Sequence, residues 1–248
     1  ADTDLTPDCG KTSASRQTFV TGKSAERAGL ALRRALLRLA NAGADARLEL
    51  SGARLLVHEG SIVREVALPG LPRDDHGYVQ CAEEIFDPPT SPLDANGQGA
   101  PYAVYGYGAH LAGVEADLRL GTVKVLRIVA AHDVGRAINP VLVEGQIEGG
   151  VAQGIGMALM EEFTPGKGEN LHDYLIPTIG DVPPIESILI ERPSSVGPFG
   201  AKGIGEQALI PTAPAILNAI YHATGARITR TPATPDRVLA ALRASRAR

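Results

Sequence analysis

Apolar residues near the start of the chain repeat at the spacing of a helix. Between Ser24 and Ala42 they fall every three to four residues, with arginines between them, at Ala28, Leu32, Leu36 and Leu39. This spacing gathers them on one helical face. Ser24 is a suitable N-cap and Gly43 a suitable stop, because serine accepts from first-turn amides and glycine adopts the left-handed conformation that ends many helices. The pattern predicts an amphipathic helix over residues 24–42.

The apolar pattern then changes to the alternation of strands. Residues 47–68 alternate around Gly52 and Glu59-Gly60, which predicts two or three short strands. The proline- and glycine-rich stretch 87–101 is expected to be a long loop. Residues 102–118 and 122–131 flank Gly121, and the second segment is rich in valine and isoleucine, so together they predict a hairpin.

Capping signals mark three further helices, expected at 139–163, 212–223 and 234–242. Asn139 followed by Pro140 is a cap followed by a first-turn proline, and Thr234-Pro235-Asp236 repeats that order. Gly225 is expected to close the middle helix, and Ile188 to Ile190 are expected to form a short buried strand. Strands and helices alternate irregularly and without an internal repeat, so the sequence predicts an α+β fold.

Composition narrows the class of protein. With 248 residues, of which 44% are hydrophobic and 21% charged, the chain is long enough for one large or two small domains. The formal charge is −4 and the 24 basic residues are mostly scattered, which argues against nucleic-acid binding. No apolar run approaches the roughly 18 residues of a membrane span, so a cytoplasmic protein is expected. Cys9 and Cys81 form no CxxC pair, which excludes an iron–sulfur or structural zinc site built from this chain alone.

A glycine-rich loop near the end of the chain carries the strongest candidate for chemistry. Residues 197–206 read GPFGAKGIGE and deliver one carboxylate, Glu206, ahead of the predicted helix 212–223. Glycine this dense lets a backbone pass close to a ligand or to another segment. A tight connection between a strand and a helix is the equally good alternative, and Lys202 in the same loop fits either a cofactor phosphate or a structural loop contact.

The predicted helix after Asn139 also contains many glycines, at positions 145, 149, 150, 154 and 156. Each glycine inside a helix costs about 0.8 to 1 kcal/mol relative to alanine. One explanation is close helix packing, and the other is a backbone approached by a bulky ligand, with Gln153 offering an amide donor and acceptor between the glycines.

Two weaker signals complete the candidate chemistry. Residues 13–17 (SASRQ) offer hydroxyl and backbone donors in a row, which suits a pterin edge or a pyrophosphate, although an ordinary polar turn explains them too. Asp133, after an apolar strand, fits either a cleft residue or the cap of a turn. The six histidines show no HxxEH or HxH spacing, so no metal site made of side chains is expected.

Several of these stretches, in this order, resemble one family, the molybdenum-cofactor-binding subunit of the xanthine dehydrogenase and aldehyde oxidoreductase hydroxylases. The matching stretches span almost the whole chain: Gly10 to Gln17, Asp87 to Gly99, His132 to Pro140, Gly145 to Gly156 and Gly197 to Glu206. The last two are the specific ones. The resemblance implies that residues 1–248 form the C-terminal half of a molybdopterin-binding domain. Such a half needs completion by a partner chain, either because the subunit is naturally split or because the chain is a processed fragment.

The resemblance also implies roles for individual residues. Glu206 corresponds to the family's catalytic base, and Gln153 corresponds to a glutamine beside the metal. Ala14, Ser15 and Gln17 are implied to bind the cofactor. Further cofactor contacts are expected from Gly154, Lys202 and Gly205. One departure is Gln207, where many relatives carry proline. No side chain of this chain is expected to bind the metal directly, because in this family the pterin dithiolene holds the molybdenum.

The implied function is that of a molybdenum-dependent oxidoreductase, which hydroxylates an aldehyde or N-heteroaromatic substrate with oxygen from water. The expected cofactor is molybdopterin, in its cytosine dinucleotide form, with molybdenum. Partner chains are expected to carry the other half of the domain, a [2Fe-2S] subunit and an FAD subunit. Three alternatives stay open: a non-catalytic assembly half, a carbon monoxide dehydrogenase, or a coenzyme-A thioester reductase on the same scaffold.

Overall fold

The computed structural model describes residues 2–4, 6 and 8–246. Contacts within the chain divide it into two compact units, one of residues 20–90 and one of residues 1–19 together with 91–248. We call these the small unit and the large unit. The single cofactor-binding domain expected over residues 1–248 therefore stays a prediction.

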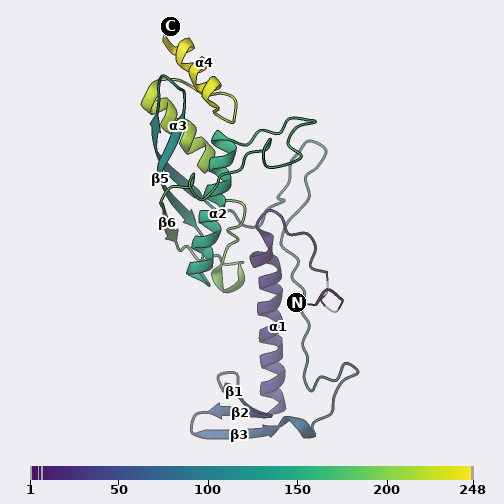
Figure 1. Cartoon of the computed structure of the whole chain (residues 1–248). Coiled ribbons are helices and arrows are strands. Elements are labelled where there is room, and N and C mark those ends of the chain that lie inside the picture. Colours follow the sequence, from purple (N-terminus) through teal and green to yellow (C-terminus); the bar gives the residue numbers. More distant parts are fainter. Residues whose placement is uncertain (1, 5, 7, 247–248) are drawn as a thin grey trace. The chain divides into compact units, whose positions relative to one another are not determined.

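The small unit contains most of helix α1 (Arg16–Leu39) and a three-stranded antiparallel sheet. Its strands are β1 (Arg47–Ser51), β2 (Arg54–Glu59) and β3 (Ile62–Ala67), which confirms the three short strands predicted for residues 47–68 (Figure 1). A compact core of Leu37, Ala40, Ala46, Leu55 and Val57 joins the end of the helix to the sheet.

Helix α1 begins at Arg16, so the predicted start at Ser24 is wrong. Ser24 lies inside the helix, and its hydroxyl donates to the Glu84 carbonyl at 2.7 Å rather than capping first-turn amides. Residues 16–23 include threonine, valine and glycine, which are weak helix formers. Propensity is a weak guide to a helix boundary, and tertiary contacts decide it.

The large unit is built on a second three-stranded sheet of strands β4 (Gly108–Ala116), β5 (Val123–Asp133) and β6 (Ile185–Ile190). Strands β4 and β5 are antiparallel, which confirms the predicted hairpin, although β4 begins six residues after Tyr102. Strand β6 runs parallel to β5 and is reached through helix α2 (Pro140–Leu159), because parallel neighbours need a long crossover.

Helices α2 and α3 (Thr212–Thr224) pack on the same face of this sheet (Figure 1). One core cluster contains residues of β5, α2, α3 and α4 (Pro235–Arg246), with Ile128, Ile155, Ile216 and Val238 among its buried members. Strand β6 confirms the strand predicted at Ile188 to Ile190, but it is an edge strand and the prediction that it is buried is wrong. Ile188 and Ile190 are 42% and 43% exposed, because alternate residues of a strand point to opposite faces.

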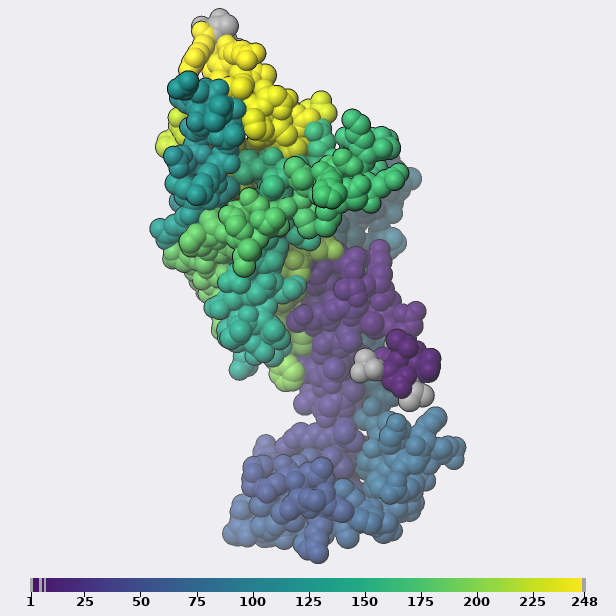
Figure 2. All heavy atoms as spheres, viewed as in Figure 1, coloured from purple at the N-terminus to yellow at the C-terminus, as the bar shows by residue number. Residues whose placement is uncertain are grey.

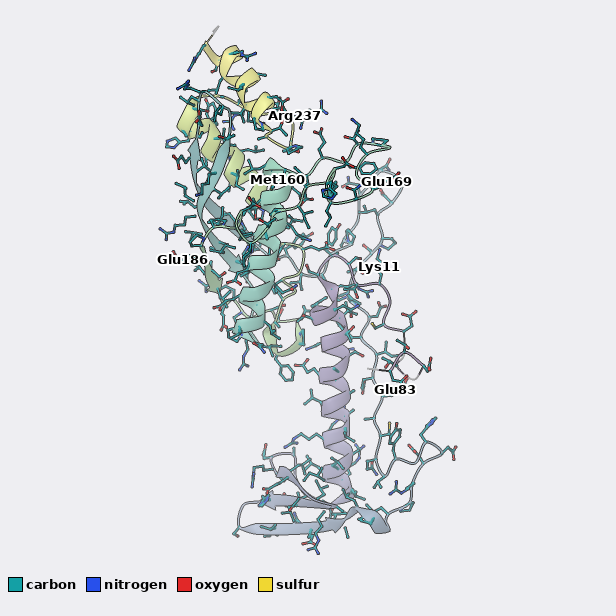
Figure 3. All side chains as sticks on the ribbon, in the orientation of Figure 1. Lys11, Glu83, Met160, Glu169, Glu186 and Arg237 are labelled. Atoms are coloured by element: carbon teal, nitrogen blue, oxygen red, sulfur yellow. The ribbon has the colours of Figure 1, made fainter. Side chains whose placement is uncertain are left out.

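Two of the predicted helix caps are present. The Asn139 side chain accepts from the Leu142 amide at 3.2 Å at the start of α2, and Gly225 ends α3 in the left-handed conformation. Helix α2 ends at Leu159, before the predicted Phe163. In the segment that follows, Glu162 accepts hydrogen bonds from Arg230 and from Arg237 of α4 (Figure 3 labels Arg237).

The turn between β4 and β5 packs against α4. A Cβ on Gly121 would lie 2.3 Å from the Pro235 carbonyl oxygen and 2.8 Å from Leu239, so only glycine fits there. Figure 2 shows the teal atoms of this turn beside the yellow atoms of α4. Over the described part of the chain, none of the helices is both long and apolar enough to cross a membrane.

Candidate active site

The glycine-rich loop 197–206 lies along the segment that follows strand β5. The Arg136 amide donates to the Gly200 carbonyl at 2.9 Å, and the Lys202 amide donates to the Val134 carbonyl at 3.0 Å. Gly135 and Ala201 form an isolated β-bridge between the same two segments. Main-chain pairing with the motif after β5 therefore fixes the first part of the loop.

The carboxylate at the end of this loop meets the serine-rich segment from the start of the chain. The Ala14 amide donates to Glu206 Oε1 at 2.8 Å, and the Glu206 amide donates to Ser15 Oγ at 2.7 Å. A Cβ on Gly203 would lie 1.8 Å from the Ser15 carbonyl oxygen, so the close approach requires glycine there. Residues about 190 positions apart thus form one junction.

Both residues on the serine side of this junction have an unusual backbone. Ala14 and Ser15 each have a φ of 55°, in the left-handed region that non-glycine residues rarely adopt. Such a conformation costs on the order of 1 to 3 kcal/mol and persists where surrounding contacts fix it. Here the conformation directs the Ala14 amide and the Ser15 hydroxyl at Glu206, while the Glu206 side chain stays exposed.

The glycines of α2 divide into those where a Cβ would meet other atoms, which are Gly150, Gly154 and Gly156, and those that face open space. A Cβ on Gly154 would lie 2.3 Å from Thr212 Cβ, and one on Gly150 would lie 2.7 Å from Ala208 Cβ. These two glycines allow α2 to pack closely against α3 and the segment before it. Buried Thr212 fills the space into which a side chain at position 154 would project. The explanation that a ligand approaches the Gly154 backbone from this side is therefore wrong.

Gly145 and Gly149 form the second group, because a Cβ on either would meet no atom within 4 Å. They lie on an exposed part of α2 that also carries Gln146 and Gln153. Since these glutamines are seven residues apart, or two helical turns, they lie on one face of the helix. Gln146 Nε2 is 3.8 Å from where a Cβ on Gly205 would lie, so it borders the Glu206 junction.

Gln146 is a site candidate that the sequence reasoning missed. Its distance of seven positions from Gln153 is a signal that could have identified it. Gly205 itself is exposed, and a Cβ on it would lie 3.4 Å from Ser15 Oγ. Gln17 turns back on its own segment, because its Nε2 donates to Thr12 Oγ1 at 3.1 Å. Cofactor contacts by Gln17, Gly205 and Gln153 stay predictions.

Lys202 forms an ion pair within the protein. Its ammonium lies 2.6 Å from Asp133 Oδ2 and donates to the Tyr105 carbonyl at 2.9 Å, and both side chains of the pair are only about one-eighth exposed. Asp133 also accepts from the Gly135 amide through Oδ1 at 3.0 Å, so it caps the turn after β5. The structure thus shows Lys202 in a structural loop contact and Asp133 as the cap of a turn. The Lys202 charge is already balanced by a carboxylate.

Two histidines form a polar chain that links β4, β5 and α3. His110 Nε2 is 2.7 Å from His132 Nε2, and His110 Nδ1 is 3.0 Å from Thr212 Oγ1. His132 is fully buried, and its Nδ1 has no hydrogen-bond partner. One of the two Nε2 atoms carries the proton that joins the rings, and His110 Nδ1 pairs with the Thr212 hydroxyl.

Both histidines are held neutral. Burial, followed by the proximity of His132, lowers the pKa of His110 from 6.5 to about 4. Burial likewise lowers the pKa of His132 below its ordinary value of 6.5. Between the ordinary pKa of 6.5 and the lowered pKa values, the folded state therefore binds fewer protons than the unfolded state.

We predict that acid weakens the fold through these histidines. Below pH 6.5 these histidines become protonated in the unfolded chain but stay neutral in the folded chain. The free energy of unfolding therefore falls progressively as the pH drops toward 4. Since one pKa unit corresponds to about 1.4 kcal/mol, the full contribution of His110 is roughly 3 kcal/mol. Urea unfolding between pH 7 and pH 4.5 measures this loss.

The control for this acid effect is His110→Asn, which keeps a polar group at the position and removes the titration. Its stability should depend less steeply on pH over the same range. An unchanged pH dependence in this variant would show that other groups cause the acid sensitivity.

A pocket of about 620 Å³ lies elsewhere, around the start of β5 and the end of α2. Its lining includes Val125, Met160 and residues 180–184, and none of the predicted site residues (Figure 3 labels Met160). The candidate active-site residues therefore lie outside this pocket. Among the described residues, no three His, Cys, Asp or Glu side chains are grouped so that they could hold a metal ion.

Comparison with known proteins matches this chain to one group. The family model described as "Molybdopterin cofactor-binding domain" matches residues 1–183. The putative xanthine dehydrogenase molybdenum-binding subunit of Escherichia coli is 32% identical over 96% of this chain and 32% of its own length. The nicotine 6-hydroxylase large subunit of Paenarthrobacter nicotinovorans is 42% identical over 56% of this chain and 18% of its own length.

Solved structures give the same result. The aldehyde oxidoreductase of Desulfovibrio desulfuricans superposes with a TM-score of 0.74 at 30% identity, over 95% of this chain and 24% of that protein. The chain thus spans about a third or less of the length of each of these relatives. The mixed helices and sheets of the chain are those of the corresponding part of these enzymes, which confirms the predicted α+β class.

Proposed function

The chain belongs to the family of molybdopterin cofactor-binding domains of xanthine dehydrogenase-type enzymes, and from this premise we propose that it is part of the catalytic subunit of a molybdenum hydroxylase. The observation that carries the proposal is the junction of Glu206 with Ala14 and Ser15. Three predicted motifs meet there, since Gln146 of α2 borders the same junction. A carboxylate beside several polar donors is the arrangement that such an enzyme needs.

The residues around the junction fit a molybdopterin cofactor. Gly145 and Gly149 leave open space on α2, and the exposed amides of Gln146 and Gln153 flank it. Amide and hydroxyl groups suit a pterin edge and its phosphate without a metal ion of their own. We propose that these residues, with Ala14 and Ser15, bind the cofactor in its cytosine dinucleotide form, and that the cofactor's own ligands hold molybdenum.

The bound cofactor supplies the two-electron oxidation, and the chain supplies proton transfer and orientation. We propose that Glu206 is the general base, which accepts a proton from the attacking water-derived oxygen. The hydrogen bond from the Ala14 amide to Oε1 holds the carboxylate in one direction. A general base of this kind contributes about 10² to 10⁴ in rate.

The proposed substrate is an aldehyde or an N-heteroaromatic compound. The relatives are named as an aldehyde oxidoreductase, a xanthine dehydrogenase subunit and a nicotine 6-hydroxylase subunit, so both substrate classes occur among them. Each class offers an electron-poor carbon to the attacking oxygen. The exposed Glu206 side chain suits a base that must reach a bound small molecule.

We further propose that the chain works in a complex. Two of the relatives are named as subunits, a molybdenum-binding subunit and a large subunit. By analogy, one partner chain supplies the rest of the molybdopterin-binding region, and others carry a [2Fe-2S] cluster and FAD to remove electrons. Obligate interfaces of this kind bury about 2,000 Å² or more.

Expression of this chain alone is expected to give a protein with little molybdenum. A tagged form purified from its native cells is expected to contain partner chains together with the metal. The physical reason is that the proposed partner chain completes the cofactor pocket, so affinity for the cofactor depends on assembly. Elemental analysis for molybdenum and mass spectrometry of the purified complex measure both. A monodisperse lone chain with full metal content would contradict the proposed partner.

A further inference from the structure

We propose that Asp133, Lys202 and Gln207 form a clamp that positions Glu206 for proton transfer. This inference rests on the proposed function of Glu206 as the base. Two of the three residues bracket the carboxylate in sequence, with Lys202 four residues before it and Gln207 directly after it. Both bracketing side chains bind the same residue, Asp133 at the end of β5.

The first arm of the clamp is Lys202. Its ammonium binds Asp133 Oδ2 at 2.6 Å and the Tyr105 carbonyl at 2.9 Å, and its amide donates to the Val134 carbonyl at 3.0 Å. The ammonium also lies 5.8 Å from the centre of the Tyr107 ring. A largely buried ion pair with further hydrogen bonds holds a fixed geometry, because each charge needs all its partners.

The second arm is Gln207. Its Nε2 donates to the Asp133 carbonyl at 3.2 Å. Its side chain also fills the space above Gly106, where a Cβ would lie 1.5 Å from Gln207 Oε1. Gln207 is thus held by a hydrogen bond and by close packing, and the residue next to the base cannot move freely.

Asp133 is itself firmly placed. Its amide donates to the Tyr107 carbonyl at 2.8 Å, and its Oδ1 accepts from the Gly135 amide at 3.0 Å. It ends β5, which is the central strand of the sheet and has a neighbour on each side. The two arms of the clamp therefore share an anchor on the most supported strand of the large unit.

The loop needs such an anchor because it is intrinsically flexible. Gly203 and Gly205 lie between the two arms, and glycine loses more conformational freedom on ordering than any other residue. The two bonds from Glu206 to Ala14 and Ser15 lie on the exposed surface. Without the clamp, the loop would populate conformations in which the carboxylate leaves the Ala14 amide.

The test is Gln207→Met in the molybdenum-loaded complex. Methionine keeps a similar volume above Gly106 and removes the donor to the Asp133 carbonyl. Hydrogen exchange of peptides that contain residues 11–17 and 203–209 should rise about fivefold or more, as expected for one lost neutral hydrogen bond. We expect kcat to fall by a similar factor of about five while KM stays within about twofold.

Matched controls separate positioning from general stability. Gln80→Met makes the same change at an exposed site in the small unit and should alter neither exchange at these peptides nor kcat. Lys202→Arg retains the charge and should keep more activity than Lys202→Met, which leaves the Asp133 carboxylate unpaired. Lys124→Met is the corresponding exposed lysine control.

Local acceleration of exchange together with a lower kcat and unchanged molybdenum content supports the clamp. Exchange that is unchanged, or that rises uniformly across the protein, overturns it, and so does local acceleration without a loss of kcat. The exchange measurement does not depend on catalysis. Failure of the clamp is therefore distinguishable from failure of the proposed function, which would appear as full turnover in a Glu206→Gln variant.

Discussion

Replacing Glu206 with glutamine is expected to lower turnover by at least about 100-fold while leaving the molybdenum content nearly unchanged. Glutamine has the same shape, and its carbonyl oxygen can still accept from the Ala14 amide, so the junction should persist. It cannot accept a proton as a carboxylate does. The loss therefore falls on the chemical step, and kcat should decrease more than KM increases.

The chain offers a matched control for this substitution. Glu191 is also an exposed carboxylate that accepts a backbone amide, from Ala137 at 3.1 Å, and it lies just after β6. Glu191→Gln should leave turnover unchanged. Initial rates at saturating substrate, with molybdenum measured on the same samples, give the comparison, and wild-type turnover in Glu206→Gln would exclude Glu206 as the base.

Gly154→Val is expected to destabilise the protein strongly. The new side chain would collide with Thr212, whose Cβ lies 2.3 Å from the required Cβ position and which is fully buried. Overpacking of a tight core costs about 1 to 3 kcal/mol, and more where the backbone must move. The free energy of unfolding, measured by urea titration of the purified complex, should fall by at least this amount.

Gly29→Val on an exposed part of α1, outside the proposed site, is the control, because a Cβ there meets nothing within 4 Å. Its intrinsic helix propensity improves by a few tenths of a kcal/mol, so stability should stay the same or rise. Thr212→Ala combined with Gly154→Val should recover part of the lost stability, since it removes Thr212 Cγ2 and Oγ1, two of the three atoms in collision. Equal stability of the Gly154→Val and Gly29→Val variants would contradict the packing explanation.

Many elements of the fold could be predicted because their signals are local. Asn139 and Pro140 start α2, Gly225 ends α3, and the alternation in residues 47–68 becomes three strands. A cap or a left-handed glycine acts on the amides and carbonyls of its immediate neighbours, so the residues that decide the structure are adjacent in the sequence. The α+β class followed from the same signals.

The predictions that failed depended on residues far away in the sequence. Ser24 is a good N-cap by itself, yet α1 begins at Arg16 and the Ser24 hydroxyl binds Glu84. Ile188 and Ile190 are as apolar as any core residues, yet β6 is an edge strand with one face exposed. Hydrophobic patterning states which residues can be buried, whereas the arrangement of neighbouring elements decides which are.

The candidate site shows the same division. By itself the sequence singled out Glu206 and the glycines of α2, because glycine and carboxylate positions are visible as residue types. Ala14 and Ser15 were implied only by the resemblance to a known family. Only the tertiary structure decided that the Ala14 amide binds Glu206, that Asp133 balances Lys202, and that Gly154 faces Thr212 while Gly149 faces open space. These pairings join residues separated by tens to nearly 200 positions, and the choice of partner depends on distances and directions that only the folded chain defines.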